Sequence, residues 1–503
     1  MVMFLRSSAA LFAAVAVAAC GGGSSADLSG TGKKSQVDGT VTGFGSIIVD
    51  GVRYPTPNVQ VDADGDAGTL QDLSVGMVVS LRVNEAGEAI FVRYRDNVEG
   101  PVSSVDMDRE EFVVLGQTVR VDELTTFEDV SLATLQVGDR VEVSGAVDTD
   151  GAILASFVEL ETDGLDGEEV LGNVRDLDTA ALTFRINDLV VDYSAASVDV
   201  TGGLRNGPPV EVEGVLNADT GVLQATEVES FDVVVRAPGE DDLDEEEQEL
   251  SVSGVVRDLA ADGSRFSLNQ FTVLVTPTTE FDDDGPQTLS VRQRVEVDGV
   301  LNEFGELVAT EIEVQPKVDF EIEGTVDAVD ITAGTLTLLG GVTVTVTEDT
   351  SFKDDSDQPV REFGLADINP GDRVEIVGVS ESERIVAIRL EREDSDDDED
   401  GDGERDGDKL RGAVTQADAN SSQFVVQGTT VQVDASTEFE GYADAADFFA
   451  RIRPGDQVEV EGRYSAGTMT LIATEVEAEE RDEDDEDDED DEDDEDDEVD
   501  EDE

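Results

Sequence analysis

Histidine and tryptophan are absent from this chain of 503 residues, and a single cysteine is present. The absence of histidine excludes Ser-His-Asp and Cys-His mechanisms of nucleophilic catalysis. It also excludes zinc and copper sites built from histidine, and one cysteine cannot supply the several thiolates of a structural zinc site. Because no disulfide can form within the chain, each domain must be stabilised by its own core. The residue types therefore favour a protein that is not an enzyme and has no cofactor, with calcium as the one candidate exception.

Basic residues are scarce, since 32 Lys and Arg stand against 122 Asp and Glu, and the formal net charge is −90. Such a chain is a poor partner for nucleic acid, because binding the phosphate backbone requires positive charge. The partners that this charge favours are divalent cations and cationic proteins of the cell envelope. Three acidic runs cannot bury enough apolar surface to fold. They are predicted to be disordered, as two linkers and a tail: residues 236–249, 393–408 and 479–503.

Cys20 follows a short apolar stretch, residues 7–19, and ends the sequence Val-Ala-Ala-Cys. The stretch is too short to span a bilayer, which requires about 20 residues, and it indicates a secretory signal at residues 1–19. The segment resembles the lipobox of bacterial lipoproteins, in which the matching cysteine receives a diacylglycerol and the new N-terminus is acylated, commonly by palmitate. The resemblance implies a lipid anchor on Cys20 and a tether at residues 20–36. Because Gly21 follows the cysteine, it also implies an outer-membrane location. Whether the protein faces the periplasm or the cell surface is left open. An ordinary signal peptide, with Cys20 incidental, is the alternative.

One pattern of strands recurs six times along the rest of the chain. Each copy opens with a glycine and a valine-containing strand, as in Gly39-Thr-Val and Gly412-Ala-Val. A later strand alternates apolar and polar residues and ends in glycine, as in Arg294-Val-Glu-Val-Asp-Gly299. Alternation of this kind predicts half-buried strands. The six copies, called the first to the sixth repeat, are residues 37–98, 99–165, 169–235, 250–316, 319–392 and 409–478.

The sixth repeat can be followed from strand to strand. Its predicted elements are three strands, a short helix and two further strands, at residues 410–417, 423–427, 430–433, 443–452, 457–464 and 469–477. A helix between the third and fourth of five strands is typical of a Greek-key barrel of the OB type. A curled meander or a small sandwich with the same strands is the alternative. The predicted fold is therefore all-β, a tandem array of six small five-stranded OB-like barrels.

These motifs together resemble a known family. The lipobox, the Gly-x-Val openings, the sequence Gly-Asp-x-Val-Glu-Val-x-Gly and the ending Ala-Thr-Glu-Val-Glu are similar to bacterial lipoproteins that carry the domain of unknown function 5666. The resemblance covers most of residues 37–480. It implies no established activity, and no catalytic residue can be transferred from it.

Two acidic loops are candidate calcium sites, because carboxylates at alternate positions are typical of loops that bind hard cations. Neither loop is a complete EF-hand. In the first, Ala67 and Leu73 occupy the sixth and twelfth positions, and in the second Gly407 occupies the twelfth. Ordinary acidic loops are therefore the alternative. The candidate ligands are Asp62, Asp64, Asp66, Asp396, Asp398 and Asp400.

Two other motifs are interpreted as structural. Asp219-Thr-Gly matches the signature of aspartic proteases, but it lies where the neighbouring repeats have turn residues, so we predict a hairpin turn. A recurrent Thr-x-Phe is predicted to contribute to packing and not to bind a ligand. Its four clear copies end at Phe127, Phe281, Phe352 and Phe439.

The sequence therefore leads to two functional hypotheses. The first is a lipid-anchored protein of the cell envelope with a non-catalytic structural, scaffold or adhesion-like role. The alternative is a module that binds divalent cations, calcium above all, or cationic ligands through its acidic segments. The specific partner and the oligomeric state are left open.

Overall fold

The computed structural model describes residues 35–148, 151–161, 167–231, 235, 249–269, 271–282, 288–302, 304–356, 358–381, 384–393 and 407–478. Cys20, the predicted signal, the three acidic runs and the candidate ligands Asp396, Asp398 and Asp400 lie largely or wholly outside these residues. The described part of the chain is all-β with repeated sheets, as predicted. Its helices are one α-helix and three short 3-10 helices: α1 (Ala445–Arg451), η1 (Leu70–Asp72), η2 (Met107–Arg109) and η4 (Leu365–Asp367). None of the described helices is long and apolar enough to cross a membrane.

The strands of the first three repeats follow the predicted order with additions. The first repeat contains β1 (Gln36–Phe44), β2 (Ile47–Val49), β3 (Val52–Tyr54), β4 (Gln60–Ala63), β5 (Asp66–Gly68), β6 (Val78–Val83) and β7 (Ala89–Tyr94). The second contains β8 (Val98–Asp106), β9 (Glu111–Val114), β10 (Gln117–Arg120), β11 (Thr126–Glu128), β12 (Arg140–Val147) and β13 (Ile153–Leu160). The third contains β14 (Glu168–Asn173), β15 (Arg175–Asp178), β16 (Thr183–Ile186), β17 (Leu189–Asp192), β18 (Ser197–Asp199), β19 (Pro209–Asn217) and β20 (Val222–Ser230).

The last three repeats have the same organisation. The fourth contains β21 (Glu249–Val255), β22 (Arg265–Leu268), β23 (Phe271–Leu274), β24 (Glu280–Phe281), β25 (Arg294–Leu301) and β26 (Leu307–Val314). The fifth contains β27 (Phe320–Asp330), β28 (Thr335–Leu338), β29 (Val342–Thr345), β30 (Ser351–Asp354), β31 (Arg373–Glu381) and β32 (Arg384–Glu393). The sixth contains β33 (Asp408–Asp418), β34 (Gln423–Val426), β35 (Thr429–Gln432), β36 (Glu438–Glu440), β37 (Gln457–Ser465) and β38 (Thr470–Ala478).

The Thr-x-Phe motif forms a short strand that the sequence pattern did not predict. In the sixth repeat this strand is β36, which pairs in parallel with β38. The hydroxyl of Thr437 donates to the carbonyl oxygen of Ala473 at 2.9 Å and accepts from the amide of Asp434 at 3.0 Å. Phe439 packs against the core of the sixth repeat. The predicted packing role is therefore confirmed, and the motif also fixes the connection to the last strand.

The strand pairings of the sixth repeat return to their starting point. β33 pairs with both β34 and β37, β34 pairs with β35, β35 pairs in parallel with β38, and β38 pairs with β37. The second and fifth repeats have the same order of pairings. Side chains alternate accordingly, and in β37 Val458 and Val460 are buried, whereas Glu459 and Glu461 lie on the other face.

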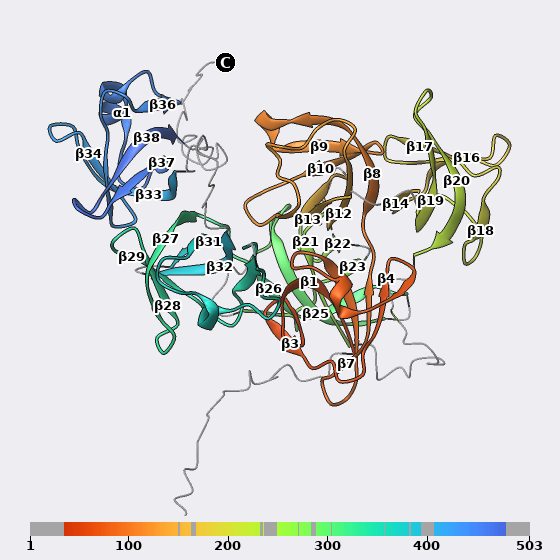
Figure 1. The fold of residues 1–503 in the computed structure, drawn as a ribbon. Helices are drawn as coiled ribbons and strands as arrows, with labels where there is room; N and C mark the ends of the chain where they lie inside the picture. The colour runs from red at the N-terminus through yellow and green to blue at the C-terminus, as the bar shows by residue number, and fades with distance from the viewer. Residues whose placement is uncertain are drawn as a thin grey trace, which may run out of the picture.

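The repeats join one another through their first strands. β8 pairs with β14 and β27 pairs with β33, both antiparallel, so the second repeat joins the third and the fifth joins the sixth. β1 pairs in parallel with β21, which joins the first repeat to the fourth. Apolar cores extend over the second and third repeats and over the fifth and sixth. Figure 1 shows the fifth and sixth repeats, in cyan and blue, on one side of the first four. Order along the chain is therefore not the order in space.

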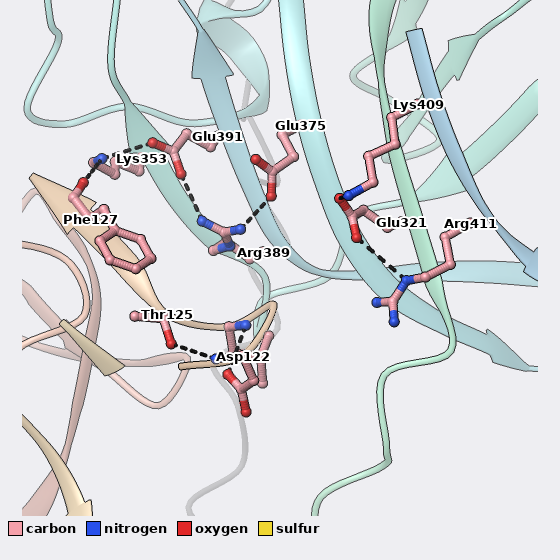
Figure 2. A network of polar contacts seen from close by, with 11 residues as sticks. Asp122, Thr125, Phe127, Glu321, Lys353, Glu375, Arg389, Glu391, Lys409 and Arg411 are labelled. Carbon is pink, nitrogen blue, oxygen red and sulfur yellow. Dashed lines mark hydrogen bonds and ion pairs between the residues drawn. The ribbon is translucent and has the colours of Figure 1, made fainter. Parts of the chain in front are cut away.

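Basic side chains also connect repeats that are distant in sequence. The guanidinium of Arg294 in the fourth repeat lies 2.6 Å from a carboxylate oxygen of Asp122 in the second. Lys353 of the fifth repeat donates from Nζ to the carbonyl oxygen of Phe127 in the second at 2.7 Å (Figure 2). Arg361 of the fifth repeat stacks over the ring of Phe44 in the first, 3.7 Å from its centroid. The described repeats are therefore packed against one another.

Candidate functional site

The first repeat differs from the others at one of its predicted calcium loops. Where the other repeats have one short strand beside the last strand, the first repeat has a hairpin, β4–β5. Its turn is made by Asp64 and Gly65, both in the left-handed region at φ 51° and 86°. The amide of Gly65 donates to Oδ1 of Asp62 at 3.0 Å, as in other aspartate turns. The sequence Asp-Ala-Asp-Gly-Asp therefore has a local reason to form this turn without any ion.

The three candidate aspartates of this hairpin do not share one site. Asp62 forms an ion pair with Arg95 at 3.0 Å, and Arg95 also contacts Glu211 of the third repeat at 3.2 Å. Asp66 is exposed on β5. Only Asp64 lies among other carboxylates. The structure therefore separates the three predicted ligands and leaves Asp64 as the one in a cluster.

Asp64 lies beside two carboxylates that come from elsewhere in the chain. Asp96 belongs to the connection between β7 and β8, and Glu169 belongs to β14 of the third repeat. One carboxylate oxygen from each of these three residues lies within 4.8 Å of the other two. Asp96 is 1% exposed and Glu169 is 8% exposed, whereas Asp64 is open to solvent. We call Asp64, Asp96 and Glu169 the junction cluster, because it lies where the first three repeats meet.

Three buried carboxylate oxygens of the junction cluster lack a hydrogen-bond donor within the described part of the chain. Among the described residues, neither carboxylate oxygen of Asp96 has a hydrogen-bond donor, and Oε1 of Glu169 has none. Burial, together with the nearby carboxylates of Glu169 and Asp64, raises the pKa of Asp96 well above its usual range. Burial also raises the pKa of Glu169 to about 10. Asp64 is exposed as a residue, but the partial burial of its carboxyl group raises its pKa to about 6. A buried carboxylate without a partner is unfavourable by several kcal/mol.

The basic side chains around the junction cluster are already paired. Arg95 is held between Asp62 and Glu211. Arg140 contacts Glu99 at 2.8 Å and Glu168 at 3.1 Å. Glu99 itself lies opposite Glu169 in the pairing of β8 with β14. Arg95 therefore offsets part of the charge of Asp64 and Glu169, whereas Glu99 adds negative charge beside the cluster.

A second group of acids lies nearby in the second repeat. Carboxylate oxygens of Glu142, Glu159 and Glu161 lie within 4.8 Å of one another, and all three residues are half-buried. Glu142 accepts a hydrogen bond from the hydroxyl of Tyr94 in the first repeat. Burial raises the pKa of Glu142 to about 8 and that of Glu159 to about 7. Unlike the junction cluster, this group has no member that is almost completely buried.

A cavity of about 130 Å³ lies where the first four repeats meet. Asp38 lines it and accepts hydrogen bonds from Ser80 and, at 2.6 Å, from Gln36. Arg93, another lining residue, stacks over the ring of Phe231 at 5.0 Å from the centroid. The polar groups here are engaged with one another, so the cavity is part of the packing between repeats.

The sequence Asp219-Thr-Gly forms the predicted turn between β19 and β20. Oδ1 of Asn217 accepts from the amides of Asp219 and Thr220 at 3.1 and 3.2 Å. Gly221 has a positive φ of 68°. The predicted turn is confirmed.

Sequence reasoning missed Asp96 and Glu169, because neither belongs to a recognisable acidic motif. The alignment of the repeats nevertheless contained a signal for Glu169, a difference of charge at one aligned position. Glu169 stands three residues before Gly172, and the residue three before Gly412 is Lys409. An exchange of lysine for glutamate at matching positions indicates different charge partners at the two places.

The comparisons with known proteins define the family and leave the function open. A solved structure titled "drosophila Unr CSD456" is 16% identical over 46% of this chain and 97% of that chain, but its TM-score of 0.17 supports no argument. No curated protein matches the chain. The family model described as "Domain of unknown function (DUF5666)" matches residues 99–159, 172–229, 253–313, 323–391 and 411–477. Since these segments make up more than half of the sequence, the chain belongs to the DUF5666 family.

Proposed function

We propose that this protein is a lipid-anchored, non-catalytic scaffold of the bacterial cell envelope, built from six OB-like barrels that act as one rigid body. The observation that carries the proposal is the pairing of first strands, which joins the repeats two by two (β8 with β14, β27 with β33 and β1 with β21), together with the side-chain contacts of Arg294, Lys353 and Arg361 that link these pairs. Such pairings fix the relative orientation of two repeats through backbone hydrogen bonds. A flexible string of domains would lack them.

The barrel assignment draws on two features of the sixth repeat. Its strand pairings run from β33 through β34, β35, β38 and β37 back to β33. Its helix α1 stands between the third long strand and the fourth, where an OB barrel has the helix that covers one end. Phe448 of α1 is fully buried and contacts the ring of Phe424 at a centroid distance of 4.9 Å.

A structural role also agrees with the chemistry available to the chain. The sequence contains no histidine, and most charged groups between repeats hold other charged groups of the same protein. The partners that suit a surface of charge −90 are divalent cations and cationic envelope proteins. The role proposed here is therefore to place such a surface at a fixed distance from the membrane.

The anchor is tested by metabolic labelling with a palmitate analogue in the native host. We expect label on the wild-type protein in the outer-membrane fraction and none on Cys20→Ser, which should be released in soluble form. Protease treatment of intact cells then distinguishes the surface from the periplasmic face. Labelling of Cys20→Ser equal to that of the wild type would refute the anchor.

The rigid body is tested by small-angle X-ray scattering of the chain from Gly21 onward. We expect a scattering profile that agrees with the packed arrangement of Figure 1. An extended profile, typical of six independent domains joined by linkers, would refute the scaffold as described.

A further inference from the structure

We propose that Asp64, Asp96 and Glu169 are the protein ligands of a divalent-cation site, with calcium as the preferred ion, that ties the first three repeats together. The proposal goes beyond the scaffold role and does not depend on the lipid anchor. It is carried by three carboxylate oxygens within 4.8 Å of one another, two of them on side chains that are 1% and 8% exposed.

The first argument is the lack of partners. Buried charges in folded proteins are paired or coordinate metals. Asp96 is almost completely buried, and both of its carboxylate oxygens are without a hydrogen-bond donor in the described chain. Glu169 is buried beside it with Oε1 unpaired. One carboxylate oxygen of each residue lies within reach of the other two, so a single cation between them would satisfy all three.

The second argument is the geometry and the type of the ligands. Calcium binds carboxylate oxygens at about 2.4 Å, so two oxygens on one ion lie at most about 4.8 Å apart. One oxygen from each of the three residues of the junction cluster lies within this limit of the other two. The exposed side of Asp64 leaves room for the water molecules that complete the six to eight ligands of calcium. Magnesium requires a tighter octahedron and gives up its water reluctantly, so three flexible carboxylates favour calcium.

The third argument comes from the equivalent place between the fifth and sixth repeats. There Lys409 occupies the position of Glu169, and it lies opposite Glu323 as Glu169 lies opposite Glu99. Nζ of Lys409 contacts Glu321 at 3.1 Å and Glu459 at 3.2 Å. One junction therefore contains its own cation among the carboxylates. The other has only carboxylates at that position and requires a cation from solution.

A cation in the junction cluster would have a structural effect, because its three ligands come from different segments. Asp64 lies in the hairpin of the first repeat, Asp96 in the connection to the second, and Glu169 in the third. Such an ion binds only when these segments are packed together. It therefore stabilises their packing by mass action.

The test is calcium binding and thermal unfolding of the chain from Gly21 onward, which retains the acidic runs. Unfolding is followed by circular dichroism at fixed ionic strength, with calcium chloride, with magnesium chloride and with a chelator. Binding of one tight equivalent, above the weak background of the acidic runs, is measured by equilibrium dialysis with radioactive calcium. We expect one tight equivalent and a rise in melting temperature that calcium gives and magnesium gives only weakly.

Three variants assign the site. Asp96→Asn and Glu169→Gln should each lose the tight equivalent and the calcium-dependent rise in melting temperature. Asp66→Asn is the matched control, because it makes the same change of charge in the same hairpin outside the cluster, and it should retain both. Glu169→Gln serves as the second variant if Asp96→Asn does not fold.

Two results would overturn the proposal. A calcium response that is equal in the wild type and in both cluster variants would mean that the ion binds the acidic runs. No tight equivalent in the wild type would mean that the carboxyl groups of the cluster remain protonated and hold no ion.

Discussion

The junction between the second and third repeats and the junction between the fifth and sixth are built on the same backbone plan. In both, the first strands of two neighbouring repeats pair antiparallel, β8 with β14 and β27 with β33. Their charges differ. The second–third junction surrounds Glu169 with other acids, whereas the fifth–sixth junction places Lys409 at the equivalent position.

The fifth repeat and its junction with the sixth pair buried acids with cations of the chain itself (Figure 2). Glu391, 7% exposed, lies 2.8 Å from the guanidinium of Arg389 and 2.8 Å from Nζ of Lys353. Arg389 also contacts Glu375, and Glu321 contacts Lys409 at 3.1 Å. The comparison teaches that a buried carboxylate in this family can be neutralised from within the chain. Where the cation is missing, a proton or an ion must take its place.

The largest expected effect is the loss of Arg389, the central cation of the charge network within the fifth repeat. Arg389→Met leaves Glu375 and Glu391 buried with less positive charge, so the free energy of unfolding of the fifth and sixth repeats should fall by about 3–5 kcal/mol. Urea unfolding followed by circular dichroism measures it. The matched control is Arg451→Met, which removes the exposed ion pair with Asp447 and should cost less than about 1 kcal/mol. Equal effects of the two substitutions would refute the importance of burial.

The second effect is the conversion of one junction into the other. Glu169→Lys places a cation beside Asp96 as Lys409 does beside Glu321. In the presence of a chelator it should raise the free energy of unfolding by about 1–3 kcal/mol, because it satisfies a buried carboxylate. The neighbouring Glu168→Lys should have the opposite effect, since Glu168 already pairs with Arg140 at 3.1 Å. If both substitutions destabilise the protein, the comparison of the two junctions is wrong.

The third effect is a dependence of stability on pH. Burial raises the pKa of Glu142 from 4.5 to about 8, and the groups around it are Tyr94, Glu159, Glu161 and the carboxylate of Asp64. The folded state therefore retains a proton that the unfolded chain loses at lower pH. The stability gained from the protonated Glu142 is complete below pH 4.5 and is lost as the pH rises through about 8.

The direction of this pH dependence is checked by measuring the unfolding of the protein between pH 5 and 9 in the presence of a chelator. The free energy of unfolding should fall with rising pH, with a share on the order of a few kcal/mol from Glu142, since each pKa unit corresponds to about 1.4 kcal/mol. Glu142→Gln retains an acceptor for the hydroxyl of Tyr94 but does not titrate, so its pH dependence should be flatter. A stability that increases over this range, or an unchanged slope in Glu142→Gln, would contradict the assignment.

The sequence predicted the strands because each alternates apolar and polar residues over several positions, as Val458 to Glu461 do. It missed the short strand at Glu438–Glu440, because three residues are too few for a period to appear. The pairing of β1 with β21 was also beyond prediction, since it joins Val37 to Ser251 across two intervening repeats. Nothing in the pattern of either strand selects the other as its partner.

The candidate site was predicted in part, for a similar reason. Asp64 belongs to a local acidic pattern, so the sequence revealed it. Asp96 and Glu169 become neighbours of Asp64 only when three segments pack together, and no local pattern records that. The same pattern made Asp62 and Asp66 appear equivalent to Asp64, although their surroundings in the folded chain differ.

The smallest expected effect separates Asp62 from Asp64 within one hairpin. Asp62→Asn removes an ion pair with Arg95 whose side chains are 27% and 15% exposed, so the loss of stability should be about 1 kcal/mol or less. Because Asp62 is held by Arg95 and lies outside the junction cluster, the variant should retain the tight calcium equivalent, whereas Asp64→Asn should weaken it. Equilibrium dialysis of both variants under the same conditions makes this comparison. If Asp62→Asn loses calcium while Asp64→Asn retains it, the ion is bound by the alternating loop alone, and the cation site does not extend to the buried carboxylates of the second and third repeats.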